Sequence, residues 1–231
     1  MNSSFQHIQQ HFEKQLPFVV FREPNEQIVQ AFLQQNNKLH KVRDFNETGF
    51  VFAPFQESEQ FVSVLFPASE CELLNFDFPP LKVKSKPLNT DKEATAPKEY
   101  IHLIESAISS IQQNKFDKVV LSQKISSALQ PQQALEIFKR MLSKYPSAFV
   151  YCWFHPKVGL WLGATPEILA SVHGNTLQTV ALAGTQTYNG SQEVTWGEKE
   201  LNEQQIVTNY IVEQLEVLKI KTEASKSNPP K

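Results

Sequence analysis

The chain has 231 residues, of which 41% are hydrophobic and 20% are charged. These fractions are typical of a globular protein with a sizeable core. The formal net charge is −2, so the chain has no excess of positive charge to neutralise phosphates, and we expect neither a nucleic acid nor a membrane as partner. The polar N-terminus lacks the apolar core of a signal peptide. Because Cys71 and Cys152 are too few for a disulfide scaffold or a zinc cluster, we expect a cytoplasmic protein without a cysteine-bound metal.

The N-terminal part of the chain predicts short helices and strands. We expect two short helices within residues 5–33, on either side of a strand at 16–21. Runs rich in Phe and Val at 49–55 and 61–68 predict two further strands. Residues 82–98 hold charges, small residues and prolines but almost nothing to bury. This composition favours a surface linker, and a loop that covers a site is the alternative.

The next part of the chain predicts two helices separated by a strand. Apolar residues recur at helical spacing over 98–113, a strand-like run follows at 116–126, and a second helix starts from Pro131. The apolar stripe of that second helix consists of Ala134, Leu135, Phe138 and Leu142.

Consecutive strands are then predicted, at 148–155, 159–163, 168–173 and 176–184. Their connections are short, and Gly174-Asn175 is a typical two-residue hairpin turn. Short connections require antiparallel pairing, because a parallel crossover needs many more residues. The last helix is expected to begin near Thr195, which has capping-box spacing to Glu198. The predicted fold class is therefore α+β, with antiparallel β-sheets and helices packed outside.

Glu203 lies on the apolar side of the last predicted helix. It precedes Val207 and Ile211 at helical spacing, so the three side chains share one face. A carboxylate on such a face is costly unless it is paired or binds a cation, and Mg²⁺ takes oxygen ligands from one or two carboxylates plus an anionic substrate. The alternative is that Glu203 and the neighbouring Glu200 only favour the helix dipole in the first turn.

Other candidates each have a structural alternative. Lys118 precedes the apolar run VVL, where a desolvated amine can act as a general base, but the residues alone favour an exposed lysine at a strand end. The segment GATPE at 163–167 predicts either a bulged turn that presents Glu167 or an ordinary turn. Residues 183–185 indicate either close backbone approach to a ligand or a strand terminus.

In combination, four segments in this order resemble the chorismate-utilising enzyme family: KVVLSQ (118–123), LGATPEIL (162–169), ALAGT (181–185) and KELNEQQIV (199–207). That family comprises isochorismate synthases, salicylate synthases and the large subunits of anthranilate and aminodeoxychorismate synthases. Its isochorismate and salicylate synthases have a lysine at the start of the first segment, whereas the ammonia-using synthases usually have glutamine. The lysine here therefore implies an isochorismate synthase of menaquinone or siderophore biosynthesis.

The resemblance also implies a role for individual residues. Lys118 corresponds to the base that activates water for attack on C2 of chorismate, and Glu167 to the acid that protonates the departing C4 hydroxyl. Glu203 matches the acidic residue that binds Mg²⁺, which in turn holds the ring carboxylate. Gly184 and Thr185 match the segment that lines the substrate pocket.

The chain also departs from the family pattern. Many relatives have aspartate and histidine where this chain has Glu200 and Gln204. Relatives continue beyond the point that corresponds to Lys231, and that continuation supplies a second Mg²⁺ carboxylate and the segments that hold the substrate carboxylates. We therefore expect residues 1–90 to be a variable N-terminal part, residues 97–231 to be the first portion of the catalytic domain, and this chain alone to be inactive, with apolar surface uncovered.

Two alternative functions stay open. A salicylate synthase uses the same lysine but goes on to eliminate pyruvate. A non-catalytic chorismate-binding chain of the family would keep the motifs without turnover. In every case chorismate is the expected small-molecule partner, and we expect a monomer.

Overall fold

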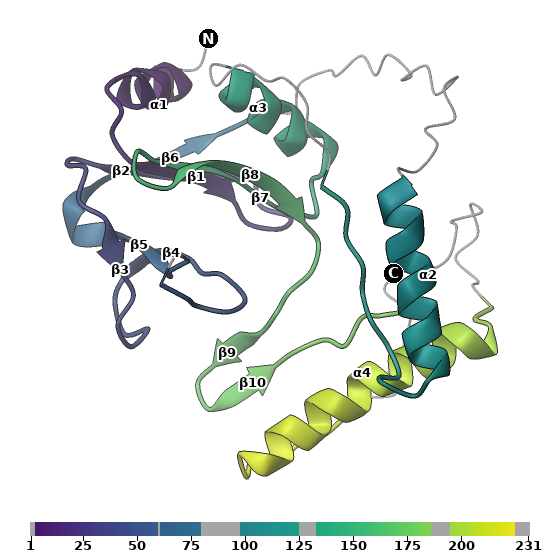
Figure 1. Ribbon diagram of the computed structural model, residues 1–231. Helices are drawn as coiled ribbons and strands as arrows, with labels where there is room; N and C mark the ends of the chain where they lie inside the picture. The colour runs from purple at the N-terminus through teal and green to yellow at the C-terminus, as the bar shows by residue number, and fades with distance from the viewer. Residues whose placement is uncertain (1–2, 60, 80–97, 125–132, 186–194, 225–231) are drawn as a thin grey trace. The chain divides into compact units, whose positions relative to one another are not determined.

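The computed structural model of the chain describes the following residues: 3–59, 61–79, 98–124, 133–185 and 195–224. Contacts between Cα atoms divide the chain into two compact units. The first unit comprises residues 1–92 and 125–167, and the second comprises residues 93–124 and 168–231. The chain is α+β with antiparallel sheets, as the sequence predicted (Figure 1). The sequence-based division at residues 90 and 97 concerns a variable part and a catalytic part, and it stays a prediction.

The first unit is built on a five-stranded sheet in the order β6-β2-β1-β7-β8. The central strand β1 (Phe18–Arg22) pairs antiparallel with β2 (Ile28–Gln34) and with β7 (Phe149–His155). The edges are β6 (Cys71–Asp77) and β8 (Gly159–Thr165), also antiparallel. Strands that are more than a hundred residues apart in the sequence, such as β1 and β7, therefore lie side by side.

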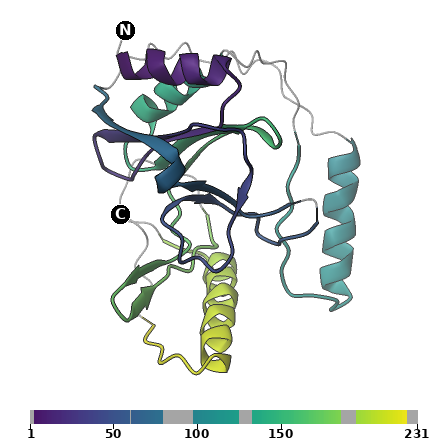
Figure 2. The same ribbon diagram turned by 90° about the vertical axis from the view of Figure 1, so that its left-hand side faces the viewer.

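One face of this sheet is covered by helices α1 (Ser3–Glu13) and α3 (Ala134–Lys144), and Figures 1 and 2 show both helices on the same side. The other face packs against a three-stranded antiparallel sheet of β3 (His40–Lys41), β5 (Val64–Pro67) and β4 (Gly49–Phe52). A short 3-10 helix, η1 (Ala68–Glu70), connects β5 to β6. The first unit thus has three layers.

The layers explain the apolar run of β1. Phe18 and Val20 are buried against the helices, whereas Val19 and Phe21 are buried against the second sheet. Side chains alternate between the two faces of a strand, so a strand that is covered on both faces reads as a continuous apolar run. Each such side chain contributes about 1.5–3 kcal/mol by leaving water.

The described residues of the second unit form two helices and a hairpin. Helix α2 (Lys98–Gln112) and helix α4 (Glu198–Val217) have no fully buried residue. Strands β9 (Ser171–His173) and β10 (Thr176–Gln178) pair antiparallel through the predicted Gly174-Asn175 turn. Gly174 has a φ of +59° there, a left-handed conformation that glycine adopts without strain. Among the described residues, no helix is long and apolar enough to cross a membrane.

Several predicted elements are confirmed. The helices at 98–113 and from Pro131 form as α2 and α3, and the apolar stripe predicted for α3 is fully buried. The first predicted helix and the strand at 16–21 form as α1 and β1. The last helix, which was predicted to begin near Thr195, forms as α4 and begins at Glu198, after its N-cap Gly197. The residues predicted as a linker, apart from Lys98, lie outside the described part of the chain, as do the last residues of the C-terminal tail.

Other predictions were wrong. The second helix within residues 5–33 is strand β2, because Val29, Ala31 and Leu33 alternate with period two and are buried in the sheet. The described part of the predicted strand at 116–126 forms no strand, since no described strand pairs with it. Strands β3 and β6 were not predicted.

Candidate functional site

Lys118 and Glu203 form an ion pair in the second unit. Lys118 lies in the extended segment after α2, Glu203 lies in the second turn of α4, and the Nζ of Lys118 donates a hydrogen bond to Oε1 of Glu203 across 85 positions of sequence. Their side chains are 20% and 33% exposed. The two residues to which the resemblance gives the base and the metal ligand are therefore in direct contact.

The ion pair between Lys118 and Glu203 is partly buried. Lys118 is not the solvated strand-end lysine of the structural alternative, because the carboxylate of Glu203 shields it. Glu203 contacts a side chain from another segment, in addition to its place in the N-terminal part of the helix. Charges that are partly removed from water need a partner, and each of these two residues is the partner of the other.

Gln204 connects helix α4 to the ALAGT segment. Its side-chain Oε1 accepts a hydrogen bond of 2.9 Å from the backbone N–H of Ala183, and its Nε2 donates one of 2.6 Å to the carbonyl of Ala181. A side-chain amide has both a donor and an acceptor, so this one residue pairs with two backbone groups of an extended segment. The segment is thereby fixed beside the turn of α4 that carries Glu203.

Gly184 fits closely against the same helix. A Cβ atom at Gly184 would stand 3.1 Å from the Cβ and from the carbonyl oxygen of Glu200, which is tighter than an ordinary van der Waals contact. The carboxylate of Glu200 is turned toward Gly197 at the start of the helix, where a negative charge is favourable. Gly184 is half-buried in this contact, and Thr185 is exposed.

Glu167 belongs to the first unit and is exposed. Its backbone N–H donates a hydrogen bond of 3.2 Å to Oγ1 of Thr165, the last residue of β8. Residues 163–165 are part of β8, and residues 166–170 are in neither a helix, a strand nor a turn, so the predicted turn does not form. Of the sequence-predicted site residues, the structure therefore brings together Lys118 and Glu203 and places Gly184 against the same helix, while Glu167 is described in the other unit.

Near Lys118, the side chain of Glu203 offers carboxylate oxygens to a cation. No group of three or more His, Cys, Asp and Glu residues that could hold a metal occurs among the described residues. Glu203 already holds a cation, the Lys118 ammonium, so its carboxylate is placed where a positive charge is accommodated. Carboxylate oxygen is the ligand type that Mg²⁺ prefers. The cysteines lie in the first unit, and burial raises the pKa of the Cys71 thiol to about 12, which keeps it protonated.

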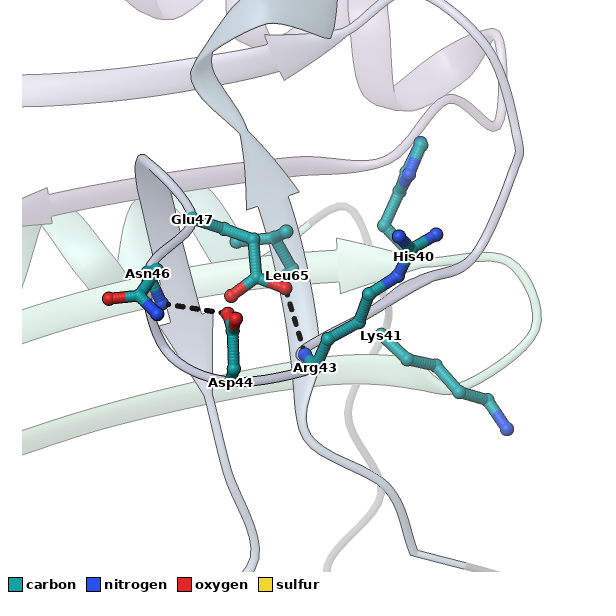
Figure 3. Close-up of a pocket in the computed structure, with 7 residues that line it drawn as sticks. All are labelled: His40, Lys41, Arg43, Asp44, Asn46, Glu47 and Leu65. Carbon is teal, nitrogen blue, oxygen red and sulfur yellow. Dashed lines mark hydrogen bonds between the residues drawn. The ribbon is translucent and has the colours of Figure 1, made fainter.

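Two open hollows on the described surface contain none of the predicted site residues. One of about 380 Å³ lies in the first unit at β3 and the loop after it (Figure 3). In that loop the backbone N–H of Arg43 donates to Glu47 and that of Asn46 donates to Asp44. The loop residues thus pair with one another. A second hollow, of about 720 Å³, lies along the first turns of α4 and is lined by Glu198, Lys199, Leu201, Asn202 and Gln205.

Sequence reasoning noted Gln204 only as a departure from relatives and missed its role in the structure. Its position directly after Glu203 was a usable signal, because consecutive helical residues are about 100° apart around the axis and a neighbour of Glu203 therefore faces a different segment. The partner segment lies about twenty residues earlier, and the sequence does not indicate that contact.

The comparison with known families agrees with the resemblance. A family model described as chorismate binding enzyme matches residues 50–229. This range includes all four motifs and every predicted site residue. No curated relative and no solved structure matches the chain significantly. Because the family model covers more than half of the sequence, the chain belongs to the chorismate binding enzyme family, a family of chorismate-utilising enzymes.

Proposed function

We propose that this protein is an isochorismate synthase, which converts chorismate to isochorismate. The observation that carries the proposal is the contact between Lys118 and Glu203. The family match supports chorismate as the substrate. A lysine at position 118 favours water as the nucleophile, because an amine can accept a proton from water whereas the amide of glutamine cannot.

The reaction exchanges one hydroxyl group for another. Lys118, as the neutral amine, removes a proton from water while the water oxygen bonds to C2 of chorismate. The C1=C2 double bond shifts to C1=C6, the C5=C6 double bond shifts to C4=C5, and the C4–O bond breaks. Glu167, in its protonated form, donates a proton to the departing hydroxyl, which leaves as water. One proton is taken and one is given, so the product is an isomer of the substrate.

The carboxylates of the second unit suit a divalent cation. Glu203 is the residue that would hold Mg²⁺, with Glu200 on the preceding turn of the same helix. When bound, Mg²⁺ supplies positive charge for the ring carboxylate of chorismate. Gln204 and Gly184 keep the backbone of the ALAGT segment beside these carboxylates. One side of the substrate pocket would therefore be held in a fixed position.

The test is the conversion of chorismate by the full product of the reading frame, in the presence of Mg²⁺, with the products separated by chromatography. We expect isochorismate, and we expect its formation to fall by about 10²–10⁴-fold in Lys118→Gln, the usual range for loss of a general base. Lys115→Gln is the matched control, because Lys115 is an exposed lysine of the same segment. Salicylate and pyruvate as products would instead identify a salicylate synthase.

A further inference from the structure

The carboxylate of Glu203 has a cation as its partner in the structure. The ammonium of Lys118 contacts Oε1 of Glu203, and both side chains are partly shielded from water. An ammonium group is a strongly hydrated point charge and a poor geometric match for a carboxylate. It therefore occupies a position that a small hard cation also favours.

One carboxylate cannot keep both cations in contact at once. A divalent cation on Glu203 would lie within a few Å of the Lys118 ammonium, and like charges repel strongly at this separation in a partly shielded site. Lys118 is able to leave, because its side chain is flexible and residues 116–124 form no strand that would hold the backbone.

We propose that Lys118 and a divalent cation exchange at Glu203, so that Lys118 is held in the ion pair before the metal binds and is released from it afterwards. This inference rests on the proposed function for the role of the metal. Its consequence is an order of events: the Nζ of Lys118 contacts Oε1 of Glu203 before the metal binds, and it is free to contact a water molecule only in the metal-loaded protein.

The experiment is a calorimetric titration of the full-length protein with Mg²⁺ alone. Lys118→Met removes the competing cation and keeps a side chain of similar length. We therefore expect this variant to bind Mg²⁺ at least about fivefold more tightly than the wild type, the ratio that corresponds to the largest free energy usual for a partly exposed ion pair. Lys118→Arg keeps the charge and pairs better with a carboxylate, so we expect binding no tighter than in the wild type. Glu203→Gln should lose most of the affinity.

Lys199→Met is the matched control. Lys199 is an exposed lysine one turn before Glu203 on α4, so its removal changes the local charge without vacating the carboxylate. An equal gain in Mg²⁺ affinity in Lys199→Met and in Lys118→Met would overturn the exchange, because the gain would then come from the change in net charge. Unchanged affinity in a folded Lys118→Met protein, or no Mg²⁺ binding in either protein, would also overturn it.

The same preparations distinguish this inference from the proposed function. If the wild type forms isochorismate but binds Mg²⁺ as tightly as Lys118→Met does, the exchange is overturned and the proposed function is kept. Tighter Mg²⁺ binding in Lys118→Met, from a wild type that forms no isochorismate, would support the exchange and contradict the proposed function.

Discussion

Gly163 lies directly opposite Tyr151 in the β7–β8 ladder, and the ring of Tyr151 covers the place where a side chain at residue 163 would stand. A Cβ atom there would be 2.5 Å from the ring carbons and the hydroxyl oxygen. Burial also raises the pKa of the Tyr151 hydroxyl. The glycine of the GATPE motif therefore leaves room for the Tyr151 ring inside the first unit, whatever the chemistry of Glu167.

Gly163→Ala should destabilise the protein by about 1–3 kcal/mol, the usual cost of overpacking, because the ring of Tyr151 has to move. Thermal or denaturant unfolding measures the change. In a Tyr151→Val background the same substitution should cost less, since the obstructing ring is gone. An equal cost in both backgrounds would show that the ring is not the obstacle.

Gln204→Leu should raise the KM for chorismate by about tenfold, because two hydrogen bonds between the ALAGT segment and α4 are lost, at about 0.5–1.5 kcal/mol each. The values of kcat and KM are measured separately, since a merely destabilised protein would lose active molecules without a change in KM. Gln205→Leu is the control, because Gln205 is exposed and its side chain donates a hydrogen bond to Asn209 of the same helix. A similar rise in both variants would remove the special role of Gln204.

Two buried histidines predict that the first unit loses stability in mild acid. Desolvation by burial lowers the pKa of His11 and of His155. In the folded chain, Nδ1 of His155 accepts a hydrogen bond of 3.1 Å from the backbone N–H of Lys157, which requires the unprotonated nitrogen.

The sign follows from proton binding. Unfolded histidines titrate near pH 6.5, so between this value and the lowered folded pKa the unfolded chain binds more protons. The free energy of unfolding should therefore fall as the pH decreases through this window, and level off below the folded pKa. Denaturant unfolding at several pH values measures it. The dependence should weaken in His155→Gln and persist in His102→Gln, an exposed histidine of α2; a dependence unchanged by His155→Gln would contradict the assignment.

Glu203→Gln should raise the Mg²⁺ concentration that half-saturates isochorismate formation, because one anionic oxygen ligand becomes a neutral amide. The measurement is the initial rate as a function of Mg²⁺ concentration at fixed chorismate. Glu216→Gln, at an exposed glutamate near the end of the same helix, should leave the curve in place. If the dependence of the rate on Mg²⁺ is unchanged in Glu203→Gln, Glu203 does not bind the metal and only favours the helix dipole.

The spacing of apolar residues along the sequence correctly predicted the elements that bury a single face. The α3 stripe of Leu135, Phe138 and Leu142 has helical spacing and is buried as expected. The error at β2 has a physical reason: a short apolar segment is compatible with both periods, and only its neighbours β1 and β6 decide for the strand. The described part of the strand predicted at 116–126 forms no strand, because a strand needs a partner to satisfy its backbone groups and no described strand pairs with it.

For the site, the sequence identified residue types but not contacts. Lys118, Glu167 and Glu203 were singled out by their motifs, yet the pairing of Lys118 with Glu203 depends on two segments that are 85 positions apart. The sequence likewise could not show that Gln204 reaches Ala181 and Ala183. Contacts of this kind depend on tertiary packing, which no periodicity records.

The measurement that tests the central claim most directly is the conversion of chorismate in H₂¹⁸O with Mg²⁺, followed by mass spectrometry of the product. If Lys118 activates water for attack at C2, the isochorismate carries one ¹⁸O atom in its C2 hydroxyl, and Lys118→Gln forms almost none of it. Isochorismate without the label, or a labelled product that Lys118→Gln forms at the wild-type rate, would contradict the account.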